Sequence, residues 1–535
     1  MAKPRKATPL PLMGLLILAF VRLAEPINFS QLFPYINQMI EDLKISAPED
    51  VGYYSGLIDS SFSLAQLFTI YFWSSLSNHI GRKPVIMIGV SGAALSAACF
   101  GFSTTLPQLL ISRSIAGALS GNIAVVDSML SEMTDETNQG PAFALLSTTW
   151  YIGCILGPIL GGNLSNPMKK WPELFSHFPI FQTYPYLLPC VVSSCFSILA
   201  ITMCGLFVAE TLPSKVVAKK VALERKNHLM NPTVSSTPSP QTPPLYGSTS
   251  STASVETTLS RSSSPSIYSS DAVSDSIVNT PKDAPPPPPQ HDGLGIIFDL
   301  LAKPHVRAII ASSFIFSFSG AAFDVVFTLY AYTRVKWGGM GRSPDQIGWA
   351  LAASGIIGAT ASLTLFPLVQ HRFNNRRLYT LFSLFWPVAF AMMPIGSVIV
   401  RFAERQKSAN AKERLVWIAT AMILIPVRIG LNVYPLRSII IKSSVDSSSQ
   451  LGAIFGFQQM MSCVARAIAP SFASSLFALS VTHRKDALGM QGNLVWAVLV
   501  VLGVLGVIIG TRVRDVKAPR SLLAEGEDSE PVNEG

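Results

Sequence analysis

Apolar residues occur along the chain in blocks of roughly 20, separated by polar segments. A helix of about 20 residues can cross a hydrocarbon core of about 30 Å, so each block predicts a transmembrane helix. The blocks form two sets of six, which predicts an all-α membrane protein with 12 transmembrane helices in two pseudo-symmetric six-helix bundles. The predicted spans are 10–36, 51–73, 84–104, 106–128, 141–164 and 184–208, followed by 306–332, 346–369, 378–400, 414–441, 451–479 and 492–511.

Composition supports this prediction. Charged residues make up only 13% of the chain and hydrophobic residues 49%, whereas a soluble protein carries about 25% charged residues. These values exclude a soluble multidomain protein. The net charge of +9 comes from basic residues scattered through the loops, without the aromatic interleaving of a nucleic-acid surface. We therefore interpret the basic residues as topology signals and contacts to membrane lipids, and we expect no nucleic-acid partner.

A polar tract rich in Ser, Thr and Pro lies between the two sets of spans. Such a composition cannot bury enough apolar surface to fold, so we predict a disordered linker. The expected organisation is an N-terminal bundle at 1–208, the linker at 209–303, a C-terminal bundle at 304–511 and a tail at 512–535. Lys and Arg counts in the first half place both termini and the linker in the cytoplasm. The plasma membrane and the vacuolar membrane both fit.

Several charged residues lie inside the predicted spans, where each costs at least about 2.5–3.5 kcal/mol on insertion scales. We expect most of them to line a central polar cavity. For Asp127 and Arg437 we favour an interfacial position with the side chain reaching to headgroups. For Arg466 the sequence is compatible with either the cavity or the interface. Gln66 shares a helical stripe with Asp59, and Trp150 and Gln458 are further predicted cavity contacts. The expected cavity charges are Arg22, Glu25, Asp59, Arg113, Asp324 and Arg428.

The two halves of the chain also resemble each other locally. The fifth span begins with a Gln-Gly-Pro-Ala-Phe sequence at 139–143 and reaches Gly157-Pro158 later. The eleventh span begins at Gln450 and reaches Ala469-Pro470 at the same offset from its Phe. Matching breaks in two six-helix halves are typical of transporters built from repeats.

Three local patterns resemble the major facilitator superfamily. The loop after the second span contains Gly81-Arg82-Lys83, but Ser74 and Asn78 stand where the superfamily usually has Gly and Asp. Gly81 suits a tight turn, whereas the absence of the usual carboxylate weakens the ionic latch attributed to this loop. The fourth span carries an Arg-Ser-Ile-Ala-Gly sequence at 113–117, which resembles the pattern associated with proton coupling in the family.

The third pattern, in the fifth span, resembles the drug:proton antiporter branch. Gly153, Gly157 and Gly161 recur every four residues and form a smooth face for close helix approach, and Pro158 bends the helix. We expect this face to serve the rocking interface between the two halves. The Arg-Leu-Ala-Glu-Pro sequence at 22–26 and the Tyr-Tyr-Ser-Gly sequence at 53–56 are similar to the zinc-induced-facilitator-like group and its fungal relatives.

These resemblances imply a secondary active transporter that works by alternating access. The expected activity is proton-coupled export of a small organic molecule such as a drug or secondary metabolite, by a monomer that needs no cofactor beyond the proton gradient. Glu25 is the first candidate for the proton site. Asp59 and Asp324 follow, with Arg22 and Arg113 as counter-charges. A proton-coupled importer, an uncoupled facilitator and a non-transporting sensor are the alternatives.

An enzyme or an ATP-driven pump is disfavoured. No Gly-x-x-x-x-Gly-Lys-Ser/Thr sequence occurs, which argues against a phosphate-binding loop. The seven histidines fall in loops or at span ends, and no pair of cysteines has zinc-finger spacing, so we expect no metal site. The six cysteines, expected to be free packing residues, are Cys99, Cys154, Cys190, Cys195, Cys204 and Cys463.

Overall fold

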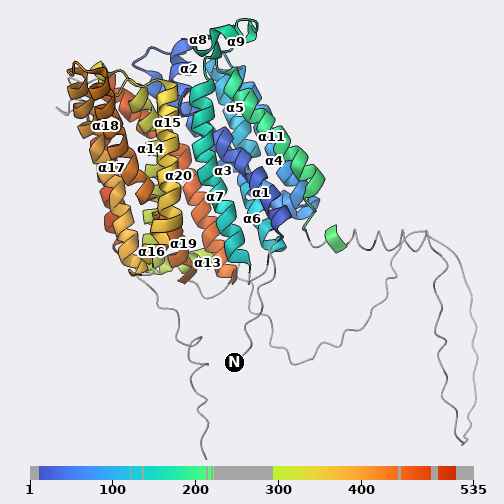
Figure 1. Ribbon diagram of the computed structural model, residues 1–535. Coiled ribbons are helices and arrows are strands. Elements are labelled where there is room, and N and C mark those ends of the chain that lie inside the picture. Colours follow the sequence, from blue (N-terminus) through green and yellow to red (C-terminus); the bar gives the residue numbers. More distant parts are fainter. Residues whose placement is uncertain are drawn as a thin grey trace, which may run out of the picture. The chain divides into compact units, whose positions relative to one another are not determined.

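A computed structural model describes residues 11–120, 122–134, 138–212, 215–217, 221, 293–370, 372–443, 448–482 and 492–513. Within these residues every regular element is a helix, as predicted. Figure 1 shows the long helices running side by side between two ends of the molecule. We call the end that carries α2 (Ile36–Asp42), α8 (Pro167–Lys170) and α9 (Pro172–Phe175) the upper end. The opposite end, which carries α16 (Phe366–Gln370), is the lower end.

The long helices follow the order of the predicted spans. Those of the N-terminal half are α1 (Leu12–Ser30), α3 (Val51–Ile80), α4 (Arg82–Gly101), α5 (Leu106–Leu119) with α6 (Asn122–Met133), α7 (Gln139–Leu164) and α11 (Leu187–Phe207). Those of the C-terminal half are α14 (Pro304–Tyr332), α15 (Pro344–Thr360), α17 (Asn375–Glu404), α18 (Ala409–Gly430) with α19 (Val433–Ser443), α20 (Ser448–Thr482) and α21 (Leu494–Gly510). Short elements α10 (Ile180–Thr183) and η1 (Val335–Trp337) lie in connections.

Eight helical segments in the described ranges are long and apolar enough to cross a membrane on length and composition alone. Two of the remaining predicted spans contain no single helix that is long enough. The fourth is divided into α5 and α6, and α21 has only 17 residues.

Four predicted spans are not single uninterrupted α-helices. The first stops at Ser30, and a turn over 31–35 separates it from α2. The fourth is interrupted at Ser120, the tenth at Leu431 and Asn432, and the eighth passes through a π-helical stretch at 361–365 before α16. In the fourth and tenth spans the helices on the two sides of the interruption have similar hydropathy, which is why the sequence pattern shows one block.

The two halves meet along two helix pairs, α3 with α20 and α7 with α15. Main-chain atoms approach closely in both pairs. A Cβ on Gly162 would lie 2.5 Å from the carbonyl oxygen of Pro344, and a Cβ on Gly348 would overlap the carbonyl oxygen of Pro158. On the other pair, Ser471 donates its backbone N–H to the hydroxyl of Ser60 at 3.0 Å.

The predicted linker lies mostly outside the described residues, as do most of the N-terminal segment before the first span and the C-terminal tail. Its last part is described and is helical: Gly293–Ala302 forms α13, which packs against α14 and α20. The C-terminal half therefore begins its helical structure before the predicted boundary at 304. The apolar sequence of α13 explains this difference, because it allows the segment to pack.

Candidate functional site

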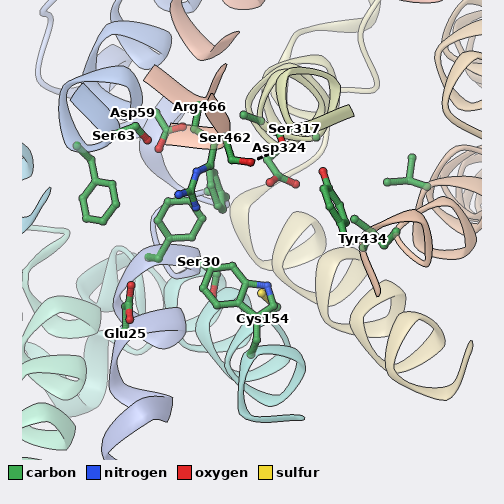
Figure 2. A pocket seen from close by; sticks show the side chains of 18 of the residues that line it. Glu25, Ser30, Asp59, Ser63, Cys154, Ser317, Asp324, Tyr434, Ser462 and Arg466 are labelled. Carbon is green, nitrogen blue, oxygen red and sulfur yellow. Dashed lines mark hydrogen bonds between the residues drawn. The ribbon is translucent and has the colours of Figure 1, made fainter. Parts of the chain in front are cut away.

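A cavity of about 300 Å³ lies between the two halves of the protein. The N-terminal half contributes side chains from α1, α3 and α7, and the C-terminal half contributes side chains from α14, α15, α17, α18, α19 and α20 and from the α18–α19 turn. Figure 2 shows Glu25 across this cavity from Asp324, and Arg466, from the C-terminal half, next to Asp59. The charged lining residues are Glu25, Asp59, Asp324, Arg428, Arg437 and Arg466.

Both carboxylates on the N-terminal side of the cavity have an arginine partner. Nη1 of Arg22 donates to Oε2 of Glu25 at 2.6 Å, one helical turn away on α1. Nη2 of Arg113 donates to Oδ1 of Asp59 at 3.1 Å and joins α5 to α3. The second pair is almost fully buried, with exposed side-chain fractions of 7% for Arg113 and 9% for Asp59. All four residues lie within the predicted spans as intramembrane charges.

The two arginines of these pairs do not line the main cavity. Arg113 lies on a separate small cavity of about 50 Å³, and its guanidinium stacks on Phe62 at 4.7 Å from the ring centroid. Arg22 lines neither cavity. The prediction that both line the central cavity is therefore wrong: each reaches a carboxylate from outside the cavity lining.

The charges on the C-terminal side of the cavity are arranged differently. Asp324 on α14 has no hydrogen-bond or ion-pair partner among the residues that the structure describes, although it lies close enough to Arg428 for electrostatic attraction. Arg428 donates its Nε to the hydroxyl of Ser354 at 3.0 Å. Within the described residues, Arg466 donates only to the sulfur of Cys463, at 3.3 Å, and its buried Nε has no partner there.

Arg437 lines the cavity, so the interfacial position favoured from the sequence is wrong. Its guanidinium stacks on Tyr434 at 5.1 Å from the ring centroid. With the amide of Gln458 oriented to suit its neighbours, the Gln458 oxygen accepts from Nη2 of Arg437 at 2.7 Å. Gln458 itself is not a lining residue, in contrast to the prediction, whereas Gln459 is. Arg466 also belongs to the lining, which settles the alternative that the sequence left open.

The other predicted contacts are partly confirmed. Gln66 and Trp150 both line the cavity, and Gln66 donates to the hydroxyl of Ser120 at 3.0 Å. Asp127 is exposed and lies outside the lining. Trp386 was not predicted from the sequence, because the span at 378–400 carries no charge that would mark a cavity-facing side; the charges of α17 lie at its two ends.

The Gly81-Arg82-Lys83 turn lies at the lower end and is held by carboxylates from other helices. Arg82 forms an ion pair with Glu132 at 3.0 Å and donates to the Asn78 oxygen at 2.8 Å. The Asn that replaces the usual Asp thus remains an acceptor. The charged partner of Arg82 is supplied by Glu132 at the end of α6.

Glu210, just beyond α11, caps the first turn of α4. Its carboxylate accepts the backbone N–H groups of Arg82 at 2.9 Å and Lys83 at 3.1 Å. Partial burial by itself raises the pKa of the Glu210 carboxyl, but the backbone donors of Leu212, Arg82, Lys83 and Thr211 together hold that pKa below its ordinary value. Gly81 has φ 108°, and a Cβ there would meet the Glu210 carboxylate, so the predicted need for glycine at this turn is confirmed.

The glycine face of α7 permits close approach, but its partner is not the one predicted. Gly153, Gly157 and Gly161 pack against α1 within the same half, where added Cβ atoms would meet Pro26, Ser30 and Gln31. The neighbouring Gly162 and the carbonyl of Pro158 make the contact with the other half instead. Pro158 lies inside the helix, as expected.

No group of three or more His, Cys, Asp or Glu side chains in the described ranges is arranged to hold a metal ion. The cavity instead offers an enclosed space lined by aromatic rings, arginines and carboxylates from two halves that meet mainly through close helix contacts. This arrangement can bind a small molecule of mixed polarity between the two halves.

Comparisons with known proteins identify relatives along most of the chain. It is 34% identical over 502 residues to the major facilitator-type transporter psiT2 of Psilocybe cyanescens, covering 92% of this chain and 88% of that protein. It is 28% identical over 501 residues to the multidrug transporter mfsB of Aspergillus fumigatus, covering 87% of this chain and 78% of the relative. It is 25% identical over 504 residues to ZINC INDUCED FACILITATOR 1 of Arabidopsis thaliana, covering 93% of this chain and 91% of the relative. The predicted resemblance to that group is thereby confirmed.

The fold comparison agrees. The structure of a D-xylose–proton symporter superposes with a TM-score of 0.62 at 12% identity, covering 95% of this chain and 99% of that one. At this identity the match concerns the fold alone. The sequence model of the Major Facilitator Superfamily matches residues 18–470, which is most of the chain. Together with the helical architecture and the cavity between two halves, this match establishes that the chain belongs to the major facilitator superfamily of membrane transporters.

Proposed function

We propose that this transporter exports a small organic molecule, such as a drug or a secondary metabolite, in exchange for protons. The observation that carries the proposal is the state of Asp324. It is a carboxylate that lines the cavity between the two halves, and it has no hydrogen-bond or ion-pair partner in the described part of the chain. The name of the Aspergillus fumigatus relative, a multidrug transporter, fits a small organic cargo.

Proton coupling requires an acidic group that gains and loses a proton within the transport cycle. Protonation of Glu25 or Asp59 would disrupt an ion pair, because each accepts from an arginine. Asp324 can take up a proton without breaking such a contact. We therefore place the coupling proton on Asp324 and not on Glu25, which was the first candidate from the sequence.

Alternating access requires the halves to separate at one end at a time. At the upper end, Glu41 of the N-terminal half accepts from the hydroxyl of Tyr332 at 2.6 Å and from Arg334 at 3.0 Å, both of the C-terminal half. This three-residue contact, which we call the upper latch, would break when the upper end opens. We propose that the lower end, with Arg82 and Lys83, faces the cytoplasm, and that one chain is the transporting unit because both walls of the cavity belong to it.

The test uses purified protein in sealed vesicles with an imposed pH gradient and a mixed panel of fluorescent drugs and metabolites. We expect gradient-driven accumulation in wild type and in Glu25→Gln, and its loss in Asp324→Asn. Asp299→Asn, which removes an exposed carboxylate on α13, is the matched control and should behave like wild type.

Each other outcome identifies an alternative. Flux that ignores the gradient would refute coupling and leave a facilitator. Accumulation in the direction of proton flow would indicate a proton-coupled importer. Loss of coupling in Glu25→Gln with retention in Asp324→Asn would return the proton to Glu25.

A further inference from the structure

The C-terminal side of the cavity contains charges of both signs that remain unpaired. We call Asp324, Arg428, Arg437 and Arg466 the C-terminal wall. Among the described residues, none of the three arginines forms an ion pair with a carboxylate, and Asp324 forms none with an arginine. The N-terminal carboxylates cannot balance this wall fully, because Arg22 and Arg113 already engage them.

The arginines of the wall also have unused hydrogen-bonding capacity. A guanidinium carries five N–H donors, yet Arg428 uses one, on Ser354. Arg466 donates to a thiol sulfur, which is a weak acceptor, and leaves its buried Nε without a partner. Arg437 directs its donors toward a single oxygen of Gln458. Donors left unused in an enclosed cavity are costly unless a ligand or water satisfies them.

The neighbouring charges do not remove this imbalance. Arg466 is close enough to Glu25 and Asp59 to be attracted by both, so part of its charge is compensated. Arg437 and Arg466 repel each other. Asp127 lies near Arg22 and Glu25 but outside the cavity lining. Arg428 is attracted by Asp324, which belongs to the same wall. In the described part of the chain, no carboxylate is among the groups that act on Arg437, so its charge is the least compensated.

This step rests on the proposed function: exchange against protons restricts which charges the cargo can carry. In an antiporter, binding of the proton must weaken binding of the cargo, and binding of the cargo must weaken binding of the proton. An anion alone would bind better once Asp324 is protonated, because the wall then becomes more positive, and this would couple the two in the same direction. A cation on Asp324 competes directly with the proton. The arginines and Asp324 are both satisfied only by a cargo that carries both signs of charge.

We propose that the cargo is a zwitterion: a small molecule with an aromatic or aliphatic body, an ammonium group that binds Asp324 and a carboxylate or phosphate that binds Arg428 and Arg437. The body of the cargo lies against Phe29, Trp150 and Trp386, which line the same cavity. Arginine suits planar anions because it can donate two parallel hydrogen bonds. The ammonium of the cargo displaces the proton, which gives exchange in place of co-transport.

The test measures binding without any gradient, by thermal stabilisation of the full chain in lipid nanodiscs. The probes are phenylalanine, 3-(aminomethyl)benzoate and 4-(aminomethyl)phenylacetate, which space the two charges differently. Each is compared with its N-acetyl derivative, an anion, and its primary amide, a cation. We expect the best zwitterion to bind at least about tenfold more tightly than either derivative, since each derivative forfeits one charge-assisted contact. Equal binding of a derivative, or no stabilisation by any probe, would overturn the proposal.

Variants locate the two charges of the bound probe. Arg428→Gln should weaken the zwitterion and the N-acetyl anion by about tenfold to hundredfold and leave the amide unchanged. Asp324→Asn should weaken the zwitterion and the amide but not the anion. A general folding defect would weaken all probes together, so it cannot produce this opposite pattern. Arg405→Gln, at an exposed arginine outside the cavity, is the matched control.

The labelling of Cys154, which lines the cavity, gives an independent readout of where the probe binds. A bound zwitterion should slow alkylation of this thiol in a variant that retains no other cysteine, and binding without protection would place the probe elsewhere and refute the site. The two proposals fail separately. Zwitterion binding without gradient-driven transport would contradict proton exchange, whereas gradient-driven export of purely cationic probes would contradict the zwitterion.

Discussion

Replacing Gly161 with alanine should separate α7 from α1. A Cβ at this position would overlap the carbonyl oxygen of Gln31 and lie 2.8 Å from its carbonyl carbon. Contacts this short do not persist, so one of the two backbone segments must move. The obstacle is backbone and cannot turn away like a side chain. Overpacking of a tight site typically costs about 1–3 kcal/mol, and we expect the upper part of that range because a whole helix must shift.

The matched control is Gly456→Ala on α20, where an added Cβ has no neighbour within 4 Å. There alanine should be neutral or should stabilise by up to about 1 kcal/mol, because glycine within a helix loses more backbone entropy on folding. The assay heats both variants and wild type in detergent and measures the soluble monodisperse fraction by size-exclusion chromatography. Equal stability of Gly161→Ala and wild type would refute the claim that α1 and α7 meet through main-chain contact.

Two further variants test the ends of the molecule. Glu210→Gln should lower the thermal stability at neutral pH, by about 1–2 kcal/mol for a lost charged helix cap. Because the folded-state pKa of Glu210 lies below its ordinary value of 4.5, this difference should shrink as the pH falls through that lower pKa, and a difference independent of pH would contradict the cap. Glu41→Ala removes the upper latch, so an impermeant maleimide added at the upper end should label Cys154 roughly tenfold faster, and an unchanged rate would exclude the latch.

Hydropathy was sufficient to predict the helical architecture, because a bilayer admits few other ways to satisfy the backbone. The interruptions were not predictable in the same way. The break at Ser120 and the turn at Leu431 and Asn432 occur inside apolar blocks. Hydropathy shows only that such a block is apolar, so it does not mark where a helix within the block ends.

Because a charge inside the membrane is costly, the charged residues within the predicted spans indicated most of the site from the sequence alone. Glu25, Asp59, Asp324 and Arg428 were expected in the cavity and line it. The pairing of Asp59 with Arg113 joins two helices that are distant in sequence, so which residue faces the cavity depends on helix rotation. For Arg437, the expectation of an interfacial position did not include a hydrogen bond to Gln458, whose oxygen accepts from the guanidinium inside the protein.

The contact of Gly162 and Gly348 with the carbonyl oxygens of Pro344 and Pro158 has an evolutionary consequence. A contact made of main-chain atoms requires glycine and a matching helix shape, but it requires almost nothing of the side chains around the cargo. Cavity residues can then be exchanged between relatives while the moving parts stay the same. A chimera that keeps this contact and receives the cavity side chains of a relative should fold, and it should acquire that relative's cargo.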